Sequence, residues 1–210
     1  MALKSPVVIL ADGTFPTHHR PLEVLERAGT IICCDGAANS FLKRSRKPDY
    51  VVGDLDSIDE EARTMFQDRL VPIPSEQSSD LEKALQFAAG KGCREVTILG
   101  AVGQRDDHSL GNLLMLWTDF GMEVMALTDT GQFSVIRMTG TFYSFEGQEV
   151  SLFPESSQVR ITTSGLEYAL DRQALPRHHK GTSNRSLGKT FTIQVTGGPV
   201  LVYQGYPPEE

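Results

Sequence analysis

The chain has 210 residues, 40% of them hydrophobic, with a formal net charge of −7 and an isoelectric point near 5.3. This length and composition allow one or two domains with a sizeable core, and the acidic balance argues against nucleic acid or an anionic membrane as a partner. The longest apolar runs fall well short of the roughly 18 residues that a membrane-spanning helix needs. The three cysteines lack metal-binding spacing and are expected to be reduced thiols, so we expect a cytoplasmic protein.

Strand and helix patterns alternate through the first part of the chain. Short apolar runs predict strands over residues 7–10, 31–34, 50–52, 70–73, 96–99 and 124–127. Apolar residues at helical spacing predict helices over residues 21–28, 58–67, 81–88 and 110–117. Such alternation is typical of parallel strands joined by crossover helices. We therefore predict a Rossmann-like, parallel-sheet α/β domain over residues 1–130.

The pattern changes after residue 130. Short strands are predicted over residues 133–137, 141–145, 149–153, 159–162, 190–195 and 200–203, with turn residues between them. Residues 172–185 are polar and basic and are expected to form a long loop. We predict that residues 131–210 form an all-β sandwich domain.

The segment Gly53-Asp54-Leu55-Asp56-Ser57 follows a predicted strand. In an extended chain residues i and i+2 point to the same side, so both carboxylates are expected to aim at one point. Ser57 and Glu60 have the spacing of a capping box, which predicts a helix start at Ser57. Converging carboxylates at the carboxyl edge of a parallel sheet favour Mg²⁺ and a phosphate ligand, although a solvated acidic turn is the simpler alternative.

A second acidic position lies at the start of a predicted helix. Ser79 and Glu82 also have capping-box spacing, which puts Asp80 in the first helical turn. Asp80 is a candidate third magnesium ligand, or it only stabilises the helix dipole. Lys83 either meets a phosphate or is solvated.

Two further loops follow predicted strands. Residues 100–108 supply glycines that let backbone N–H groups approach an anion, and Arg105 is able to clamp phosphate oxygens. This loop is neither a Walker loop nor a dinucleotide fingerprint, and His108 is equally compatible with a structural hydrogen bond. Asp35 and Asn39 lie in the other loop. Because these loops meet at one edge of a parallel sheet, together they predict a metal–nucleotide site.

The motifs resemble those of the thiamine pyrophosphokinase family, in the same order along nearly the whole chain. They are Asp35-Gly36-Ala37-Ala38-Asn39, Gly53-Asp54-Leu55-Asp56-Ser57, Ser79-Asp80-Leu81-Glu82-Lys83-Ala84-Leu85, Gly103-Gln104-Arg105-Asp106-Asp107-His108, Gly165-Leu166-Glu167-Tyr168-Ala169-Leu170 and Thr182-Ser183-Asn184. The chain departs from the family pattern at four positions, namely Ala37, Gln77, Ser79 and Gln104.

The resemblance implies a transferase that moves the diphosphate of ATP to the thiamine hydroxyl, giving thiamine diphosphate and AMP. It implies Mg²⁺ on Asp54, Asp56 and Asp80, and a homodimer with its active sites at the interface. The implied catalytic residues are Asp54, Asp56, Asp80, Arg105 and Asp107. The implied ATP-binding residues are Asp35, Asn39, Lys83, Gly103, Gln104, Arg105, His108 and Asn112. The implied thiamine-binding residues are Gln77, Ser183 and Asn184.

Two other functions remain open at this point. One is another Mg²⁺-dependent nucleotide phosphotransferase or hydrolase on the same scaffold, because an acidic metal site does not fix the acceptor. The other is a non-catalytic module that binds thiamine or nucleotide. The presence of all three central carboxylates argues against the second alternative.

Overall fold

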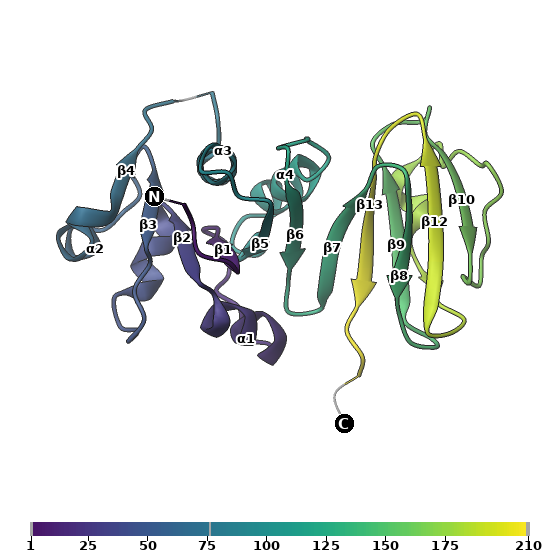
Figure 1. The fold of residues 1–210 in the computed structure, drawn as a ribbon, viewed down its shortest axis with the longest axis horizontal. Coiled ribbons are helices and arrows are strands. Elements are labelled where there is room, and N and C mark those ends of the chain that lie inside the picture. Colours follow the sequence, from purple (N-terminus) through teal and green to yellow (C-terminus); the bar gives the residue numbers. More distant parts are fainter. Residues whose placement is uncertain (1, 76, 209–210) are drawn as a thin grey trace. The chain divides into compact units, whose positions relative to one another are not determined.

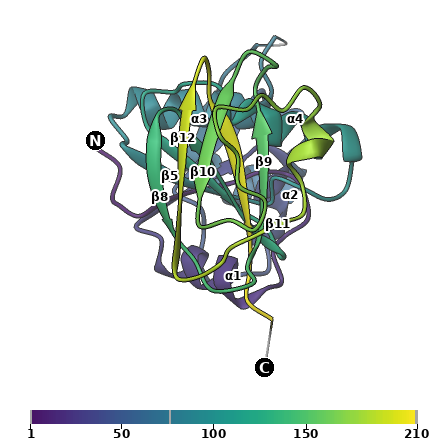
Figure 2. The same ribbon diagram turned by 90° about the vertical axis from the view of Figure 1, so that its right-hand side faces the viewer.

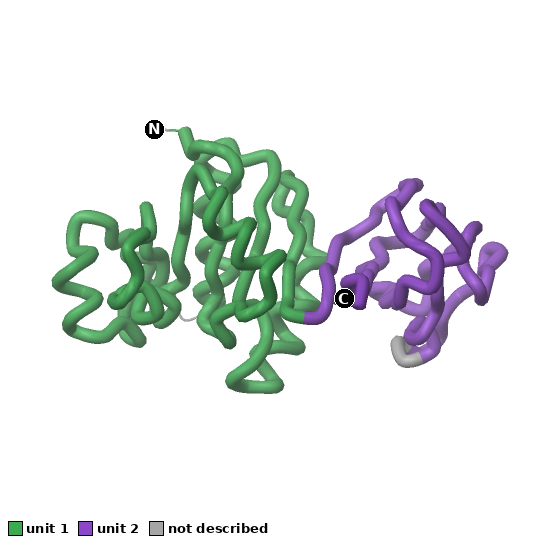
Figure 3. The backbone as a smooth tube through the Cα atoms, turned by 90° about the horizontal axis from the view of Figure 1, so that it is seen from below, with its two compact units in different colours: residues 1–129 green, residues 130–210 purple. Residues whose placement is uncertain are grey.

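The structure is a computed structural model that describes residues 2–75 and 77–208. The chain forms two compact units, residues 1–129 and residues 130–210, which Figure 3 shows in different colours. Among the described residues, no helix is long and apolar enough to cross a membrane.

The first unit is built on a parallel sheet. Its strands are β1 (Val7–Leu10), β2 (Thr30–Cys34), β3 (Tyr50–Gly53), β4 (Leu70–Pro72), β5 (Glu95–Leu99) and β6 (Glu123–Leu127). They lie in the order β4-β3-β2-β1-β5-β6, and each neighbouring pair is parallel, as can be followed in Figure 1. Every residue of β1 and β2 is buried, as expected for central strands covered on both faces. The predicted parallel sheet is confirmed.

The helices of this unit follow the predicted alternation. They are α1 (His19–Arg27), η1 (Gly36–Phe41), α2 (Glu60–Met65), η2 (Gln67–Arg69), α3 (Asp80–Gly90) and α4 (Asp106–Met115). The predicted start of α3 is confirmed, because the Ser79 hydroxyl accepts a hydrogen bond from the Glu82 backbone N–H at 3.3 Å.

Two details of the helix predictions are wrong. The second helix begins at Glu60 rather than at Ser57, because Ser57 belongs to the preceding loop: its backbone N–H donates to Asp35 and its hydroxyl donates to Asp56. The fourth helix, predicted over residues 110–117, spans Asp106–Met115 instead, and some of its apolar side chains are exposed. Leu110 is 59% exposed and Leu114 is 38% exposed.

The second unit is rich in strands. They are β7 (Gly131–Ile136), β8 (Thr139–Tyr143), β9 (Glu149–Pro154), β10 (Arg160–Ser164), β11 (Asn184–Arg185), β12 (Thr190–Thr196) and β13 (Val200–Gly205). Antiparallel pairing joins β11-β9-β13-β7 and, separately, β10-β12-β8. Strands β8, β9, β10, β11 and β12 are labelled in Figure 2. Both sets contribute to one core, for example through Val150 and Val202 on one side and Ile161 and Ile193 on the other.

The predicted long loop over residues 172–185 is not entirely irregular. It contains the short helix η3 (His178–Gly181) and ends in strand β11. Strand β11 is only two residues long and carries no apolar alternation, so periodicity could not reveal it.

The strand order changes direction between β1 and β5. From β1 the chain adds β2, β3 and β4 on one side and then returns to place β5 on the other side. The segments that follow β1 and β5 run together: the backbone N–H groups of Ala11, Gly13 and Thr14 donate to the carbonyls of Leu99, Gly100 and Val102 at 2.8, 2.9 and 2.8 Å. Open α/β sheets bind their ligands at such a point.

Candidate active site

Three carboxylates converge at the ends of β2 and β3. Oxygens of Asp35, Asp54 and Asp56 all lie within 4.8 Å of one another. The extended geometry predicted for residues 54–56 is wrong, because Leu55 has a φ of 68° in the left-handed region. The side chains converge nevertheless, since this backbone turn brings Asp54 and Asp56 to the same side while Leu55 stays buried.

Asp35 is the buried member of this cluster. Its side chain is 0% exposed, and one carboxylate oxygen accepts the Ser57 backbone N–H at 3.2 Å. The other oxygen, Oδ1, is buried and has no hydrogen-bond partner among the described residues. Burial raises the pKa of Asp35; the Ser57 hydrogen bond opposes this, and the nearby acidic groups add to it. Burying an acceptor without a donor costs free energy, so a bound ion or ligand that contacts this oxygen would recover that cost.

Lys83 lies beside the carboxylate cluster. Its side chain is almost fully buried, and its Nζ donates to Asp54 at 2.6 Å and to Asp80 at 2.9 Å. Burial acts to lower the pKa of Lys83, but the hydrogen bonds to these two carboxylates outweigh it and raise the pKa. The Lys83 hydrogen bond is also the main reason why the pKa of Asp54 is lowered. Lys83 is therefore a charged group inside the site, not a solvated one.

Asp80 approaches the cluster from the start of α3. It lies outside the group of oxygens within 4.8 Å but borders the same space. A Cβ on Gly53 would meet the Asp35 Cβ at 2.7 Å and an Asp80 carboxylate oxygen at 3.0 Å. Only glycine at position 53 lets both acidic side chains approach the end of β3.

Most of the residues predicted for ATP and metal binding line one cavity of about 460 Å³. They are Asp54, Asp56, Asp80, Lys83, Gly103, Gln104, Arg105, His108 and Asn112. Asp35 does not line this cavity but is buried next to it, within 4.8 Å of the Asp54 and Asp56 carboxylates, and Asn39 lines a neighbouring cavity of about 370 Å³. Loops that are far apart in the sequence thus bring acidic and basic groups into one cavity.

The loop after β5 needs an unusual backbone. Gly103 has a φ of 92°, and a Cβ there would meet the Thr14 hydroxyl oxygen at 2.0 Å. Gln104, at a position where the family pattern has glycine, also has a positive φ of 56°. Its side-chain amide donates to the Gly13 carbonyl at 3.1 Å and so ties this loop to the segment after β1.

Arg105 and Asp107 form an exposed pair with two hydrogen bonds, of 3.1 and 2.7 Å. The Arg105 hydrogen bond is the main cause that lowers the pKa of Asp107 to about 2. Two asparagines hold the surrounding loops. Asn112 donates to the Ala101 carbonyl at 2.9 Å, and Asn39 both donates to the Ser57 carbonyl and accepts the Asp59 N–H.

The sequence reasoning missed Asp12, which follows β1 and lines both cavities. Its position directly after a buried strand was the signal that could have found it. Cys34, at the end of β2, was also missed. It lines the carboxylate cavity but is 2% exposed, and burial is the main cause that raises the pKa of its thiol.

The three residues predicted to bind thiamine lie in different units. Gln77 is exposed in the first unit, and its backbone N–H donates to the Ser75 hydroxyl. Ser183 and Asn184 belong to the second unit, where Ser183 has a φ of 65°. The buried Asn184 side chain accepts the Tyr168 N–H at 3.0 Å and donates to the Tyr168 carbonyl at 2.9 Å. Asn184 also lines a cavity of about 90 Å³.

Comparisons with known proteins agree over both units. The family model for the thiamin pyrophosphokinase catalytic domain matches residues 22–126, and the model for the substrate-binding domain of the same family matches residues 131–203. Thiamine pyrophosphokinase 3 from Oryza sativa subsp. japonica is 27% identical, over 85% of this chain and 79% of its own length. Thiamine pyrophosphokinase 1 from Arabidopsis thaliana is 25% identical, over 69% and 66%.

Solved structures share the fold. The thiamine pyrophosphokinase from Bacillus subtilis superposes with a TM-score of 0.80 at 20% identity, over 96% of this chain and 99% of that one. The yeast enzyme superposes with a TM-score of 0.78 at 15% identity, over 95% and 85%. The chain therefore belongs to the thiamine pyrophosphokinase family, the transferases that form thiamine diphosphate from thiamine and ATP.

Proposed function

We propose that the 460 Å³ cavity of the first unit binds the triphosphate of ATP together with Mg²⁺. Asp54, Asp56 and Asp80 are the proposed metal ligands, and Asp35 joins them. The observation that carries this proposal is the convergence of three carboxylates within 4.8 Å, one of them with a buried oxygen that lacks a partner. Carboxylate oxygens are the donors that Mg²⁺ prefers, so the residues present fit this ion. Bound there, Mg²⁺ would neutralise charge on the triphosphate.

The reaction moves a diphosphate group. The thiamine hydroxyl oxygen forms a bond to the β-phosphorus, the bond from that phosphorus to the α–β bridging oxygen breaks, and AMP leaves with that oxygen. Lys83 and Arg105 supply positive charge beside the phosphates, where positioning and charge neutralisation do most of the work. Arg105 exchanges its Asp107 partner for phosphate oxygens when ATP binds.

The hydroxyl proton passes to a carboxylate. The choice lies between the acidic cluster and Asp107. The low pKa of Asp107 rests mainly on its hydrogen bond to Arg105, which this proposal breaks when ATP binds, so Asp107 stays a candidate beside the carboxylates of the cluster. Gly103, His108 and Asn112 shape the phosphate side of the cavity in this proposal, and Asn39 holds the loop that carries Asp56.

Ser183 and Asn184 are proposed to contact thiamine, and Gln77 is proposed as a further thiamine contact. The match of residues 131–203 to a substrate-binding domain supports this assignment. The Asn184 amide is already bonded to the Tyr168 backbone, so its role in the free protein is to order the loop that thiamine meets.

A homodimer with active sites at the interface is part of the proposal. Its support is α4, which carries cavity residues yet exposes Leu110 and Leu114. Exposed apolar positions on one helix are typical of a surface that a partner covers. Light scattering after size-exclusion chromatography tests this: a mass of one chain at micromolar concentration contradicts it.

The proposal also covers the fold type of the first unit and the cellular compartment. The parallel sheet, with its change of strand direction between β1 and β5, supports a Rossmann-like arrangement for the first unit. The three cysteines form no disulfide, which supports a reducing compartment such as the cytoplasm.

The testing experiment identifies products. The purified protein is incubated with ATP and Mg²⁺, with and without thiamine, and the products are identified by mass. Thiamine diphosphate with thiamine-dependent AMP is expected. ADP with thiamine monophosphate contradicts attack at the β-phosphorus, and AMP without thiamine indicates a hydrolase.

The Asp56→Asn variant tests the metal site itself. This exposed side chain has little part in packing, so the variant is expected to fold normally and lose turnover. Near-normal activity removes Asp56 from the set of metal ligands.

A further inference from the structure

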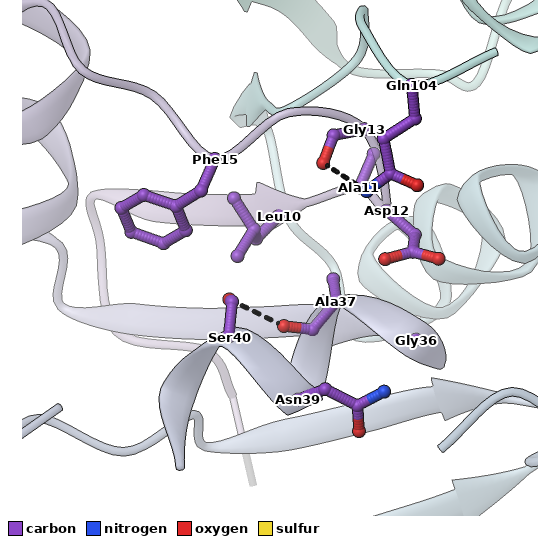
Figure 4. A pocket seen from close by; sticks show the side chains of 10 residues that line it. All are labelled: Leu10, Ala11, Asp12, Gly13, Phe15, Gly36, Ala37, Asn39, Ser40 and Gln104. Atoms are coloured by element: carbon purple, nitrogen blue, oxygen red, sulfur yellow. Dashed lines mark hydrogen bonds between the residues drawn. The ribbon is translucent and has the colours of Figure 1, made fainter. Parts of the chain in front are cut away.

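We propose that the 370 Å³ cavity beside the carboxylate site holds the nucleoside part of ATP. In this arrangement Asp12 accepts hydrogen bonds from the ribose hydroxyls, and Phe15 packs against the base. The inference rests on the proposed function, because it assigns the orientation of ATP in that site. Figure 4 shows this cavity between the segment after β1 and the short helix η1, with Phe15 toward one end and Asp12 toward the other.

The two cavities share one border. Ala11, Asp12, Gly13 and Gln104 line both of them. The 460 Å³ cavity contains the groups suited to phosphates, including Lys83. The residues that line the 370 Å³ cavity include no basic one. In ATP the ribose joins the phosphates to the base, so a triphosphate in the first cavity brings the ribose to the shared border.

Asp12 has the chemistry for a ribose. Its carboxylate packs against Gly36, where a Cβ would meet one carboxylate oxygen at 2.4 Å. Among the described residues, none donates a hydrogen bond to this carboxylate. An ionised carboxylate only accepts hydrogen bonds, and a vicinal diol offers two donors at a matching separation.

Phe15 provides a fixed apolar wall. The Arg44 guanidinium lies 3.6 Å from the centre of its ring, and Phe41 meets it edge-on with ring centres 6.3 Å apart. The buried Leu10 side chain lies beside it in the same cavity. A planar base gains contact area against such a wall without needing a hydrogen bond.

Thiamine is the competing occupant, because it also has a planar ring and carries a positive charge that an acidic group attracts. None of the residues proposed to contact thiamine, Gln77, Ser183 and Asn184, lines this cavity. The match of residues 131–203 to a substrate-binding domain also favours thiamine contacts in the second unit. The residues of this cavity all belong to the first unit. The cavity is also within the usual size range of small-molecule sites.

The test combines a substrate change with a side-chain change. The kcat and KM values are measured for ATP and for 2′,3′-dideoxy-ATP in the wild-type protein and in Asp12→Ala. The wild type is expected to favour ATP by about tenfold to a hundredfold in kcat/KM, the usual effect of hydrogen bonds to a charged group. Asp12→Ala is expected to remove this preference, with the KM for thiamine unchanged.

A second variant and a control separate this effect from general damage. Phe15→Ala is expected to weaken both nucleotides alike, by about tenfold, and to keep the preference for ribose. Asp68→Ala removes an exposed carboxylate just before β4, at the amino end of that strand, and is expected to change none of these values. Circular dichroism confirms that each variant is folded.

Two results overturn the inference. One is an Asp12→Ala protein that keeps the full preference for ATP over the dideoxy nucleotide. The other is a rise in the KM for thiamine without a change in the nucleotide parameters, which would place thiamine in this cavity. Calorimetric titration with AMP and with 2′,3′-dideoxy-AMP gives the same comparison without turnover. This titration therefore tests the inference even if the wild type makes no thiamine diphosphate. Absence of that product would contradict the proposed function, not this inference.

Discussion

Replacing Asp35 by asparagine is expected to stabilise the metal-free protein while it abolishes turnover. Asp35 is fully buried, and its oxygens lie within 4.8 Å of those of Asp54 and Asp56. At an effective dielectric constant near 20, two like charges at this separation repel by about 3 kcal/mol. Lys83 and solvent screen part of this repulsion, so we expect the variant to gain about 1–3 kcal/mol. For a chain of this length that is a rise in Tm of about 2–12 °C.

The pH dependence of this gain has a fixed sign. Because the folded-state pKa of Asp35 is raised, the wild-type protein loses stability as the pH increases from about 4 through that raised pKa. The asparagine variant has no such loss. The difference in Tm is therefore expected to be largest above the raised pKa of Asp35 and to vanish below about pH 4.

The assay is thermal unfolding in a chelator and in Mg²⁺, at several pH values, together with product formation. Mg²⁺ at a hundred times its Kd stabilises the wild type by about 2.7 kcal/mol and is expected to give the variant much less. Asp68→Asn, which changes an exposed carboxylate at the amino end of β4, is the control and is expected to be neutral. An Asp35→Asn protein that is less stable than the wild type in chelator at pH 7 refutes the reasoning.

Two further substitutions probe the same unit. Lys83→Met leaves the Asp54 and Asp80 carboxylates without their shared buried partner and is expected to lower the free energy of unfolding in urea by about 2–4 kcal/mol. An unchanged free energy of unfolding would mean that solvent already screens these two carboxylates. Gly103→Ala forces a Cβ to within 2.0 Å of Thr14 at a positive φ, and is expected to cost about 1–3 kcal/mol and most of the activity. Gly111→Ala in α4 is the control, because a Cβ there meets open space, and it is expected to raise the free energy of unfolding by up to about 1 kcal/mol. Equal effects of the two substitutions on stability would exclude the steric explanation for Gly103.

The sequence predicted the larger elements of the fold because they follow from periodicity. The buried strands β1 and β2 are continuous apolar runs, and the alternation of strands and helices indicated parallel pairing. The start of α3 was predictable, since Ser79 caps the helix through a local hydrogen bond. The start of α2 was not, because Ser57 is held by Asp35, which is 22 positions away in the sequence.

The sequence predicted which loops form the site, but not the backbone conformation, the burial or the contacts of the residues in it. The motifs indicated which strand ends carry ligand groups, and Lys83, Arg105 and the acidic residues do border one cavity. Periodicity could not show that Leu55 adopts a left-handed backbone, since a non-glycine residue seldom does so. Nor could it show that Asp35 is fully buried or that Asp12 lies between two cavities, because both depend on contacts between distant segments.

The rate at which a thiol reagent labels the buried Cys34 measures local opening of the site. The thiol lies at the cavity wall yet is 2% exposed, and its raised pKa keeps it protonated at neutral pH. A thiol reagent therefore reacts with Cys34 only in molecules in which the end of β2 has locally opened. The more exposed Cys93 serves as an internal reference for the reagent. The rate of Cys34 labelling, followed as nucleotide or Mg²⁺ is added, measures how strongly each ligand closes the site without any engineered probe.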